Sequence, residues 1–590
     1  MIHEWKNGFP WATFGRRETT EEFFSKWESQ VSIASEWRSK NSFSLIIPVT
    51  ASINPVLFSR CLNALELQSY PHWKAYIIDG TGNPSLQKAV EKREDSRFVY
   101  VPFREGADAL PSFAELPLNW VGVVEPEAVL SPVALFRFAL EMGKELEKDV
   151  FFSHEVVLKE SVNEVEGFFS KSQPSLFNLL HFNSVGKFWL VRASLLKNIR
   201  LSYQSREAEH RFLLEGSAKG WKFHLLPEFL YYGRKSPELE ASPDLIPVIK
   251  KVAVRAFEKA DVSVIDSAMG SRVQVFPHLK KATRITAVIC FRDRIDITIK
   301  CLRSLESVRN TGNLNVVLVD NESSTESVRE IEAFLSTSSL PVRLVHYPGA
   351  FNFGRMHNHV IREYCDGDLV LCLNNDVFLS PDVDLEKWAS WAIQPWVGTV
   401  GILLRYPDGR AQHCGIRGEF GDGARLARVG HFASEDFLTT LNREVFANTF
   451  AACLFRKATF QKLGGLREQE LINGFGDIAF SFQSLEAGLH HLFLGQFEGT
   501  HMESVSRGLE YEYWEECTIE REFPGILQKM LREDLAWNRV PGRRPTVTDA
   551  FLDYFRFQFR EKAPWLQPVK PAIKKLLRDI QLQRDNRVTT

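Results

Sequence analysis

A weak internal repeat is the feature of this sequence that most restricts its fold. In the first half, the apolar patterns of residues 43–49 and 74–79 predict two strands, and residues 55–67 between them have helical spacing. The same order of strand, helix and strand recurs in the second half, over residues 285–291, 297–305 and 315–320. Two β-α-β units in one chain indicate a duplicated α/β domain, with two mostly parallel, Rossmann-like sheets in tandem.

The strand ends of the two halves also correspond. The second strand of each unit ends in an aspartate, Asp79 in the first half and Asp320 in the second. Further along, residues 125–132 align with residues 374–381, and both segments end in Leu-Ser-Pro. Open α/β sheets bind ligands in the crevice beyond the carboxyl ends of their strands, so we expect these positions to face a ligand.

The tip Asn374-Asn375-Asp376 directly follows the apolar strand 369–373. Hard divalent cations that also bind phosphate need few protein carboxylates, because substrate oxygens and water complete the coordination shell. Asp376 is therefore a candidate ligand of such a cation. An Asx turn that closes the strand explains the same residues equally well.

Further polar residues of the second half fall at strand ends or turns. Asp320 can accept hydrogen bonds from a ribose or a base, and Arg292, which follows the first strand, can pair with diphosphate oxygens. Asp477 follows a glycine-containing turn and is either a helix N-cap or a general base. His501 is either a metal ligand or an ordinary surface histidine.

Length and charge limit the classes of function. A chain of 590 residues suggests roughly three to four structural units. The 72 basic and 74 acidic side chains nearly cancel, so nothing favours a nucleic-acid partner. No apolar run reaches the roughly 18 residues that a spanning helix needs, and residues 1–6 lack the apolar core of a signal peptide, so we expect a cytoplasmic protein.

Shifts in composition predict the domain boundaries. Residues 556–590 carry nine Lys or Arg against three acidic residues, with aromatic and aliphatic residues between them. A helical tail that packs on the protein is one interpretation, and peripheral contact with the inner face of the cell membrane is the alternative. The expected regions are an N-terminal helical segment (1–40), a first domain (41–235), a linker (236–282), a second domain (283–510) and a helical basic region (511–590).

The motifs of the second half form a set that extends over about residues 285–508. They are Tyr347 to Phe353, Asn374 to Val377, Tyr406 to His413, Gly476 to Ile478 and His501 to Gly508. In sequence and order these motifs resemble the inverting family-two glycosyltransferases of bacterial surface polysaccharide and O-antigen assembly. The first half is similar to the degenerate companion domain of tandem members.

The resemblance implies a GT-A fold in both halves, a nucleotide-sugar donor, a glycan or lipid-linked acceptor, and Mg²⁺ or Mn²⁺. It also implies roles for the candidate residues: donor contacts for Phe291, Arg292, Asp320 and Asn375, metal binding for Asp376 with His501 as a further ligand, and base catalysis for Asp477. The metal would neutralise charge on the leaving diphosphate, while Asp477 would take the proton of the acceptor hydroxyl.

The sequence departs from the family pattern at several positions. Cys290-Phe291 stands where the family has Pro-Thr, and Ala479 stands where a second acid follows the base. In the first half, Glu127 behind a proline replaces the metal carboxylate, and His210 takes the position of the base. We therefore expect the first domain to have lost catalysis, with a second site formed by Glu127 and His210 as the alternative.

Two other functions compete with this interpretation. One is a non-catalytic glycan- or nucleotide-binding scaffold built from decayed transferase domains, against which the joint presence of Asp376, Asp477 and His501 argues. The other is a nucleotidyltransferase that makes the sugar nucleotide itself. Such an enzyme would carry a glycine-rich phosphate loop after its first strand, and residues 291–294 contain no glycine.

Overall fold

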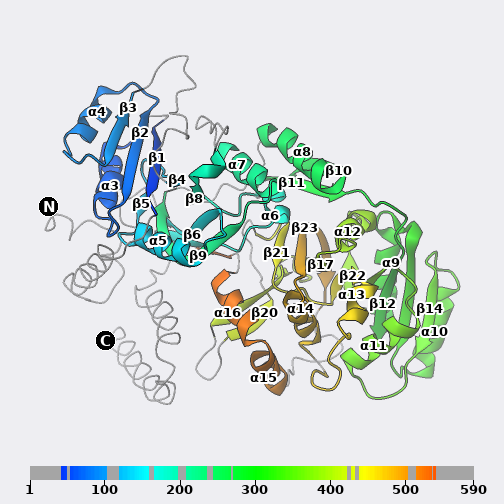
Figure 1. Cartoon of the computed structure of the whole chain (residues 1–590). Coiled ribbons are helices and arrows are strands. Elements are labelled where there is room, and N and C mark those ends of the chain that lie inside the picture. The colour runs from blue at the N-terminus through cyan, green and yellow to red at the C-terminus, as the bar shows by residue number, and fades with distance from the viewer. Residues whose placement is uncertain are drawn as a thin grey trace, which may run out of the picture.

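The computed structural model describes most of the chain between residues 41 and 539 (Figure 1). The described ranges are 41–49, 53–102, 119–158, 165–196, 207–234, 243–267, 270–420, 427–431, 438–472, 474–502, 513–533 and 536–539. The N-terminal helical segment and the basic residues 556–590 expected from the sequence lie outside these ranges.

The first sheet follows the blue to cyan part of the chain in Figure 1. Its strands run in the order β3-β2-β1-β4-β8-β6, after which β6 pairs with β9 and β9 pairs with β5. Their bounds are β1 Phe43–Val49, β2 Trp73–Asp79, β3 Phe98–Val101, β4 Trp120–Val123, β5 Val129–Leu130, β6 Val150–Leu158, β8 Trp189–Arg192 and β9 Phe223–Gly233. Strand β7 (Val165–Ser170) pairs antiparallel with the outer part of β6.

The second sheet repeats this order as β14-β13-β12-β15-β22-β17-β23-β16. The bounds are β12 Ile285–Phe291, β13 Leu314–Asp320, β14 Val342–His346, β15 Leu369–Leu373, β16 Val377–Leu379, β17 Val397–Arg405, β22 Ala452–Arg456 and β23 His490–His501. In both sheets the first four strands are parallel and the next pairing is antiparallel. The predicted α/β class and the internal repeat are confirmed, and the sheets are mixed.

Helices connect the parallel strands, and polar N-caps fix where several of them begin. Asn54 caps α3 and Asn83 caps α4, while Ser324, Asn352 and Asp384 cap α10, α11 and α12. In the first domain the helices are α3 Pro55–Glu66, α4 Pro84–Glu91, α5 Ala134–Lys144, α6 Leu176–His181, η3 Ala193–Leu196 and α7 Glu207–Ala218. In the second they are α9 Ile295–Ser307, η5 Thr311–Asn313, α10 Thr325–Leu335, α11 Phe353–Glu363, α12 Leu385–Ala392, α13 Lys457–Lys462 and α14 Gly476–Glu486.

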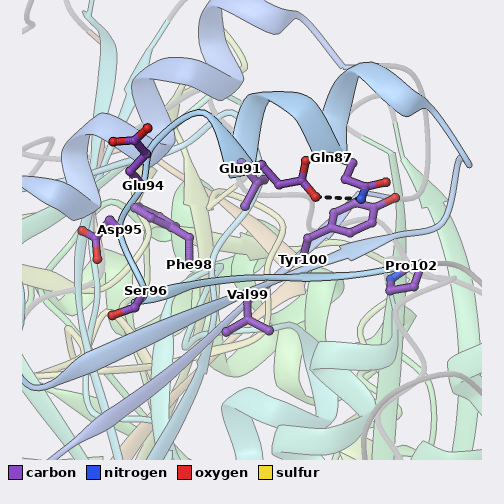
Figure 2. Close-up of a pocket in the computed structure, with 10 residues that line it drawn as sticks. Gln87, Glu91, Glu94, Asp95, Ser96, Phe98, Val99, Tyr100 and Pro102 are labelled. Atoms are coloured by element: carbon purple, nitrogen blue, oxygen red, sulfur yellow. Dashed lines mark hydrogen bonds between the residues drawn. The ribbon is translucent and has the colours of Figure 1, made fainter.

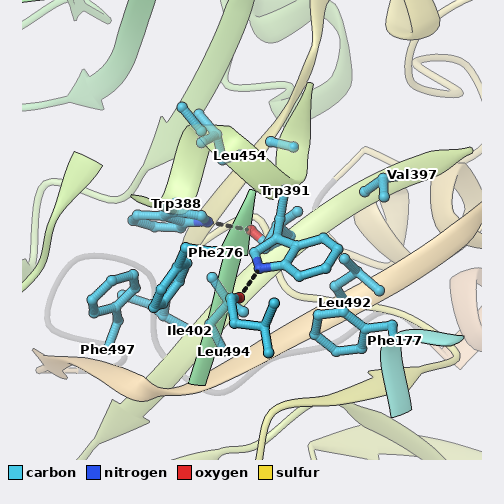
Figure 3. Packing of buried hydrophobic residues seen from close by; sticks show 14 of the residues in the cluster. Phe177, Phe276, Trp388, Trp391, Val397, Ile402, Leu454, Leu492, Leu494 and Phe497 are labelled. Atoms are coloured by element: carbon cyan, nitrogen blue, oxygen red, sulfur yellow. Dashed lines mark hydrogen bonds between the residues drawn. The ribbon is translucent and has the colours of Figure 1, made fainter. Parts of the chain in front are cut away.

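The region expected as a linker forms regular structure of its own. It contains η4 (Pro243–Leu245), α8 (Ile246–Phe257) and a hairpin of β10 (Ala260–Ser267) and β11 (Gly270–Pro277). Val275 and Phe276 of β11 are buried in a hydrophobic cluster that contains residues of both domains. Figure 3 shows Phe276 and Phe177 of α6 beside Trp391 of α12, whose indole N–H donates to the Val275 carbonyl at 2.8 Å. This region is therefore part of the packing between the domains.

A second shared cluster, which we call the interdomain cluster, lies between the two sheets. From the first domain it contains Val157, Phe169 and Phe182, and from the second Leu403, Ala411, Cys414, Leu438, Leu441, Val445 and Phe493. A polar contact reinforces the junction, since the Glu444 backbone N–H donates to Oδ1 of Asn178 at 2.8 Å. The two domains therefore bury apolar surface against each other, the dominant favourable term in such an association.

Shorter strands complete the second domain, namely β18 Ala411–His413, β19 Ile416–Phe420, β20 Ala427–His431 and β21 Arg443–Val445. Beyond residue 510 the chain forms α15 (Tyr513–Glu522) and α16 (Pro524–Glu533), then β24 (Ala536–Arg539), which pairs with β7 of the first sheet. The expectation of an entirely helical region after residue 510 is wrong for β24. Within the described ranges, no helix is long and apolar enough to cross a membrane.

Three buried histidines predict how stability depends on pH. Burial lowers the pKa of His181, His210 and His491 to about 4, against the opposing effect of a backbone hydrogen bond at each ring. The unfolded chain takes up these protons near pH 6.5 and the folded chain only near pH 4, so stability is complete above pH 6.5 and falls as the pH drops to 4. Each histidine contributes up to about 1.4 kcal/mol per pH unit in this window.

Chemical denaturation at intervals between pH 4.5 and pH 6.5 measures this loss. Glu209 has the opposite effect on stability, because burial raises its pKa to about 8. Above pH 4.5 it therefore offsets part of the change in unfolding free energy with pH that the histidines cause. His210→Gln serves as the comparison, since glutamine can donate to the Leu179 carbonyl that now accepts from Nε2 at 2.7 Å. The slope should be shallower in this variant, and an unfolding free energy that stays constant over the window in the unmodified protein would contradict the prediction.

Candidate active site

The tip after β15 lies at the carboxyl edge of the second sheet. All five residues of β15 are buried, and the Asn374 backbone N–H donates to the Ala451 carbonyl at 2.9 Å. The side chain of Asn375 points to helix α9, where its Nδ2 donates to Oγ1 of Thr298 at 3.1 Å. Asn375 is thus buried and anchors the tip to α9.

Asp376 and His501 come together at this tip. Strand β16 pairs with β23 so that Val377 lies opposite His501, and the Met502 N–H donates to the Asp376 carbonyl at 3.1 Å. Nε2 of His501 lies 3.3 Å from Oδ1 of Asp376, and the two side chains are 14% and 8% exposed. A carboxylate oxygen and an imidazole nitrogen at this separation can bind one cation.

The donor set fits a divalent cation that keeps open coordination positions. Among the residues that the structure describes, no group of three or more His, Cys, Asp or Glu forms a closed metal site. A cation held by one or two protein ligands and by substrate phosphates needs no more than this pair. Asp376 and His501 therefore suit Mg²⁺ or Mn²⁺ bound together with a diphosphate.

Asp477 lies at the N-terminus of α14, near the same tip. Its Oδ2 accepts from the Phe450 N–H at 3.0 Å, and its Oδ1 accepts from the Ile478 N–H at 2.8 Å. Because Ala451, the next residue after Phe450, is bonded to Asn374, one short segment links Asp477 to the metal-binding tip. The turn before the helix places Phe475 in the left-handed region, with φ 58°, a conformation that costs roughly 1–2 kcal/mol for a residue with a side chain.

Asp320 lies at the end of β13 and is almost completely buried. Its Oδ1 accepts from the Ser323 N–H at 2.9 Å, and its Oδ2 accepts from Nδ1 of His346 at 3.0 Å. His346 lies directly opposite Asp320 in the parallel pairing of β13 with β14, and its ring is exposed. A carboxylate in this position still has lone pairs free for a ligand.

The loop after β12 contains the remaining candidates. The Phe291 side chain is 3% exposed and packs in the hydrophobic core, so its backbone is the part that a donor could contact. Arg292 is exposed. Asp293 and Arg294 are both left-handed, and the Asp293 carboxylate accepts from the Ser324 N–H and the Ser327 hydroxyl, which lower its pKa. These hydrogen bonds hold a strained loop next to Asp320.

In the first domain, the residue equivalent to Asp320 is internally satisfied. Asp79 accepts from the Thr81 N–H and hydroxyl, from the Gly82 N–H, and from the Tyr100 hydroxyl. Burial opposes its ionisation, yet these hydrogen bonds outweigh burial and lower its pKa. Its acceptor positions are occupied by the protein, so Asp79 is a poor ligand-binding group.

The position equivalent to His501 also differs in the first domain. The shared Leu-Ser-Pro segment and the strand register place Gly233 where the second domain has His501. Glu127 accepts from the Asn54 N–H at 2.7 Å, whereas His210 is buried and donates to the Leu179 carbonyl. Each has its own protein partner, so the structure gives no support to a second site formed by Glu127 and His210.

Buried polar side chains of the first domain also contact one another. Lys171 and Glu155 are both buried and lie 2.6 Å apart, and Tyr231 donates to Oε2 of Glu125 at 2.8 Å. Tyr231 takes the position that Gly499 has in the second domain, so an aromatic ring replaces a hydrogen atom. The first domain keeps the strand order and differs from the second in the side chains beside the tip.

A groove in the first domain lies elsewhere, along the edge strand β3. It has a volume of about 710 Å³, and Figure 2 shows Glu91, Glu94 and Asp95 among the residues that line it, with Gln87 bonded to Glu91. The groove ends at Pro102, where this part of the described chain stops. It contains none of the candidate residues for catalysis.

Sequence reasoning missed residues that orient the candidates. His346 donates to Asp320, Gln412 accepts from His501 at 2.7 Å, Thr298 accepts from Asn375, and the Phe450 N–H donates to Asp477. His346 had a usable signal, because it ends the strand parallel to the one that ends in Asp320, and Gln412 lies in the motif Tyr406 to His413 on which the family resemblance rests. The others depend on contacts between distant segments.

The fold and the site define a class of protein: an α/β domain that binds its ligand at the carboxyl ends of parallel strands, with an open cation site and a helix-terminal carboxylate on one edge. The comparison with protein families is more specific. Residues 286–464 match the model of Glycosyl transferase family 2. This match covers most of the second domain, which is therefore similar to the glycosyltransferases of family 2.

Two curated relatives cover most of this chain at low identity. The uncharacterised protein y4gI of Sinorhizobium fredii is 24% identical over 518 residues, which are 84% of this chain and 56% of the relative. The O-antigen biosynthesis protein RfbC of Myxococcus xanthus is 25% identical over 497 residues, 80% of this chain and 38% of the relative. The chain thus spans about half, or less, of the length of these relatives.

Solved glycosyltransferase structures resemble the chain more weakly. Mannosyltransferase PcManGT from Pyrobaculum calidifontis, in complex with GDP-Man and Mn²⁺, is 15% identical, with a TM-score of 0.31, over 56% of this chain and 81% of that one. GalNAc-T7 with UDP, GalNAc and Mn²⁺ is 13% identical, with a TM-score of 0.32, over 38% of this chain and 44% of that one.

Proposed function

We propose that this protein transfers a sugar from a nucleotide-diphosphate donor to a hydroxyl group of a glycan, with inversion at the anomeric carbon. The observation that carries the proposal is the Asp376 and His501 pair, on the same sheet edge as Asp477 and within a domain of the glycosyltransferase family. An open cation site and a separate carboxylate are what such a displacement requires.

The donor would bind along the carboxyl ends of β12, β13 and β15. Asp320 would accept hydrogen bonds from the nucleoside, and the exposed guanidinium of Arg292 would pair with diphosphate oxygens. Asp376 and His501 would hold Mg²⁺ or Mn²⁺, which when bound supplies Lewis-acid stabilisation of the charge on the leaving diphosphate.

Asp477 is the proposed general base. The hydrogen bonds from Phe450 and Ile478 hold its carboxylate at the start of α14, and each oxygen retains a further lone pair for the acceptor hydroxyl. The hydroxyl oxygen attacks the anomeric carbon on the face opposite the leaving diphosphate as its proton passes to Asp477. Positioned base catalysis of this kind contributes around 10²–10⁴-fold.

The acceptor is proposed to be a polysaccharide or a lipid-linked glycan. This assignment draws on the relative named for O-antigen biosynthesis. An acceptor of this kind is assembled at the inner face of the cell membrane, where the basic residues 556–590 could contact anionic lipid. The first domain would be non-catalytic, since its own side chains occupy the corresponding positions.

Calorimetry with a panel of sugar nucleotides, with and without Mn²⁺, tests the proposal. We expect one class of donor to bind, its hydrolysis or transfer to require the metal, and chelation by EDTA to stop turnover. Asp320→Asn should weaken donor binding, while the equivalent Asp79→Asn in the first domain should not. Donor binding without turnover in any metal would instead support the non-catalytic scaffold.

A further inference from the structure

Gln412 lies behind the proposed metal ligand His501. It is the central residue of β18, which pairs with β17, and its side chain is buried, with 4% of the residue exposed. Its amide oxygen Oε1 lies 2.7 Å from Nδ1 of His501, while Nε2 of the same ring lies 3.3 Å from Asp376. Gln412 and the proposed cation position therefore lie on opposite sides of the imidazole.

This contact determines which nitrogen of His501 carries the proton. An amide oxygen can only accept a hydrogen bond, so Nδ1 must donate. In the neutral ring the lone pair is then on Nε2, which faces the Asp376 carboxylate. A ligating histidine usually donates its second N–H in this way, which fixes both the tautomer and the orientation of the ring.

The position of Gln412 is itself fixed by packing. Its neighbour Ala411 and nearby Cys414 belong to the interdomain cluster, together with Phe169 and Phe182 of the first domain. The guanidinium of Arg443 in β21 also donates to the Cys414 carbonyl. Contacts therefore hold the chain both before and after Gln412, so its amide has little freedom to turn away from His501.

We propose that Gln412 is a positioning residue that holds His501 as a ligand for a divalent cation. The inference rests on the proposed cation site and adds a residue that touches neither substrate nor metal. Loss of such a partner typically weakens metal affinity about 10- to 100-fold. We expect this loss for Gln412→Leu, which keeps the side-chain volume and removes the acceptor.

Electron paramagnetic resonance of free Mn²⁺ reports how much of the ion the full chain binds. It therefore measures the effect of the substitution on metal affinity without turnover. Gln412→Glu keeps an acceptor for the Nδ1 proton and should bind Mn²⁺ at least as tightly as the unmodified protein. The matched control is Gln394→Leu, which removes a glutamine that donates to the Ser390 carbonyl far from the tip. In a His501→Ala background, Gln412→Leu should have no further effect.

Nitrogen-15 resonances of His501, assigned by comparison with His501→Ala, keep the inference testable even if Gln412→Leu fails to fold. A neutral ring protonated on Nδ1 is expected, and protonation on Nε2 alone would overturn it. Equal Mn²⁺ affinity in folded Gln412→Leu and unmodified protein would also overturn it. If the unmodified protein bound no Mn²⁺, the metal site in the proposed function would itself be wrong. That result differs from equal Mn²⁺ affinity in the two proteins, so a failure of the proposed function can be told apart from a failure of this inference.

Discussion

Replacing Asp477 with asparagine is expected to lower the rate of sugar transfer by around 10²–10⁴-fold, because the amide cannot accept the proton of the acceptor hydroxyl. Donor affinity should change little, since Asp477 lies at the start of α14 and not at the strand ends that carry Asp320 and Asp376. Single-turnover rates and donor titrations on the same variant separate the two quantities.

The matched control for this change is Asp384→Asn. Asp384 caps α12 in the same domain and accepts from the Glu386 and Lys387 N–H groups, so both substitutions remove a charge at a helix N-terminus. This charge contributes roughly 0.3–1 kcal/mol to stability. The two variants should lose similar stability, and only Asp477→Asn should lose activity. Turnover at the unmodified rate in Asp477→Asn would rule out Asp477 as the base.

Replacing Asp376 with alanine is the second change with a large expected effect. It removes the carboxylate beside His501, and we expect Mn²⁺ binding to fall to the background level of the protein surface. Transfer should fall at least about 100-fold, because Lewis-acid stabilisation of a leaving oxygen is worth several kcal/mol. Turnover measured against Mn²⁺ concentration, together with direct metal titration, shows both effects.

Asp382→Ala provides the comparison for this variant. Asp382 lies six positions after Asp376, beyond β16, but it is exposed and pairs with Arg309 at the surface. An exposed ion pair of this kind contributes roughly 0–1 kcal/mol, so the variant should keep metal binding and activity. If Asp376→Ala retained the metal dependence of the unmodified protein, the cation would have to bind elsewhere.

The repeated β-α-β units of both domains followed from local patterns in the sequence. Asp79 and Asp320 mark equivalent strand ends, and the shared Leu-Ser-Pro segments align the two tips. These signals depend on hydrophobic periodicity and on turns, which are properties of neighbouring residues. They were therefore sufficient to predict the repeat and the edge of the sheet at which the candidate residues lie.

Long-range packing explains what the sequence did not reveal. Residues 236–282 were expected to be a linker because of their prolines, and within them the chain folds as helix α8 and the hairpin of β10 and β11, whose buried residues pack against both domains. Strand β24 pairs with β7, more than 360 positions earlier in the chain. A pairing of this kind has no local sequence signal.

In the candidate site, too, some features followed from local sequence patterns and others depend on packing. The sequence pointed to Asp376, His501 and Asp477 by their positions at strand ends and turns, whereas the Phe291 side chain is buried because hydrophobic core covers both faces of β12. The glycine-containing turn before Asp477 was also expected, but the left-handed residue in it is Phe475. Backbone strain at a bulky residue depends on its surroundings, which local composition does not describe.

Because of the interdomain cluster, the segment that matches the family is not the same as the part of the chain that can fold on its own. Residues 286–464 contain Asp320 and Asp376, yet Asp477, His501 and Phe493 lie beyond that segment, and Phe169 and Phe182, which pack in the same cluster as Phe493, belong to the first domain. A truncated enzyme would present that surface to water. Selection can therefore act on the first domain through the geometry of the second, so its sequence would stay constrained even if it bound no substrate of its own.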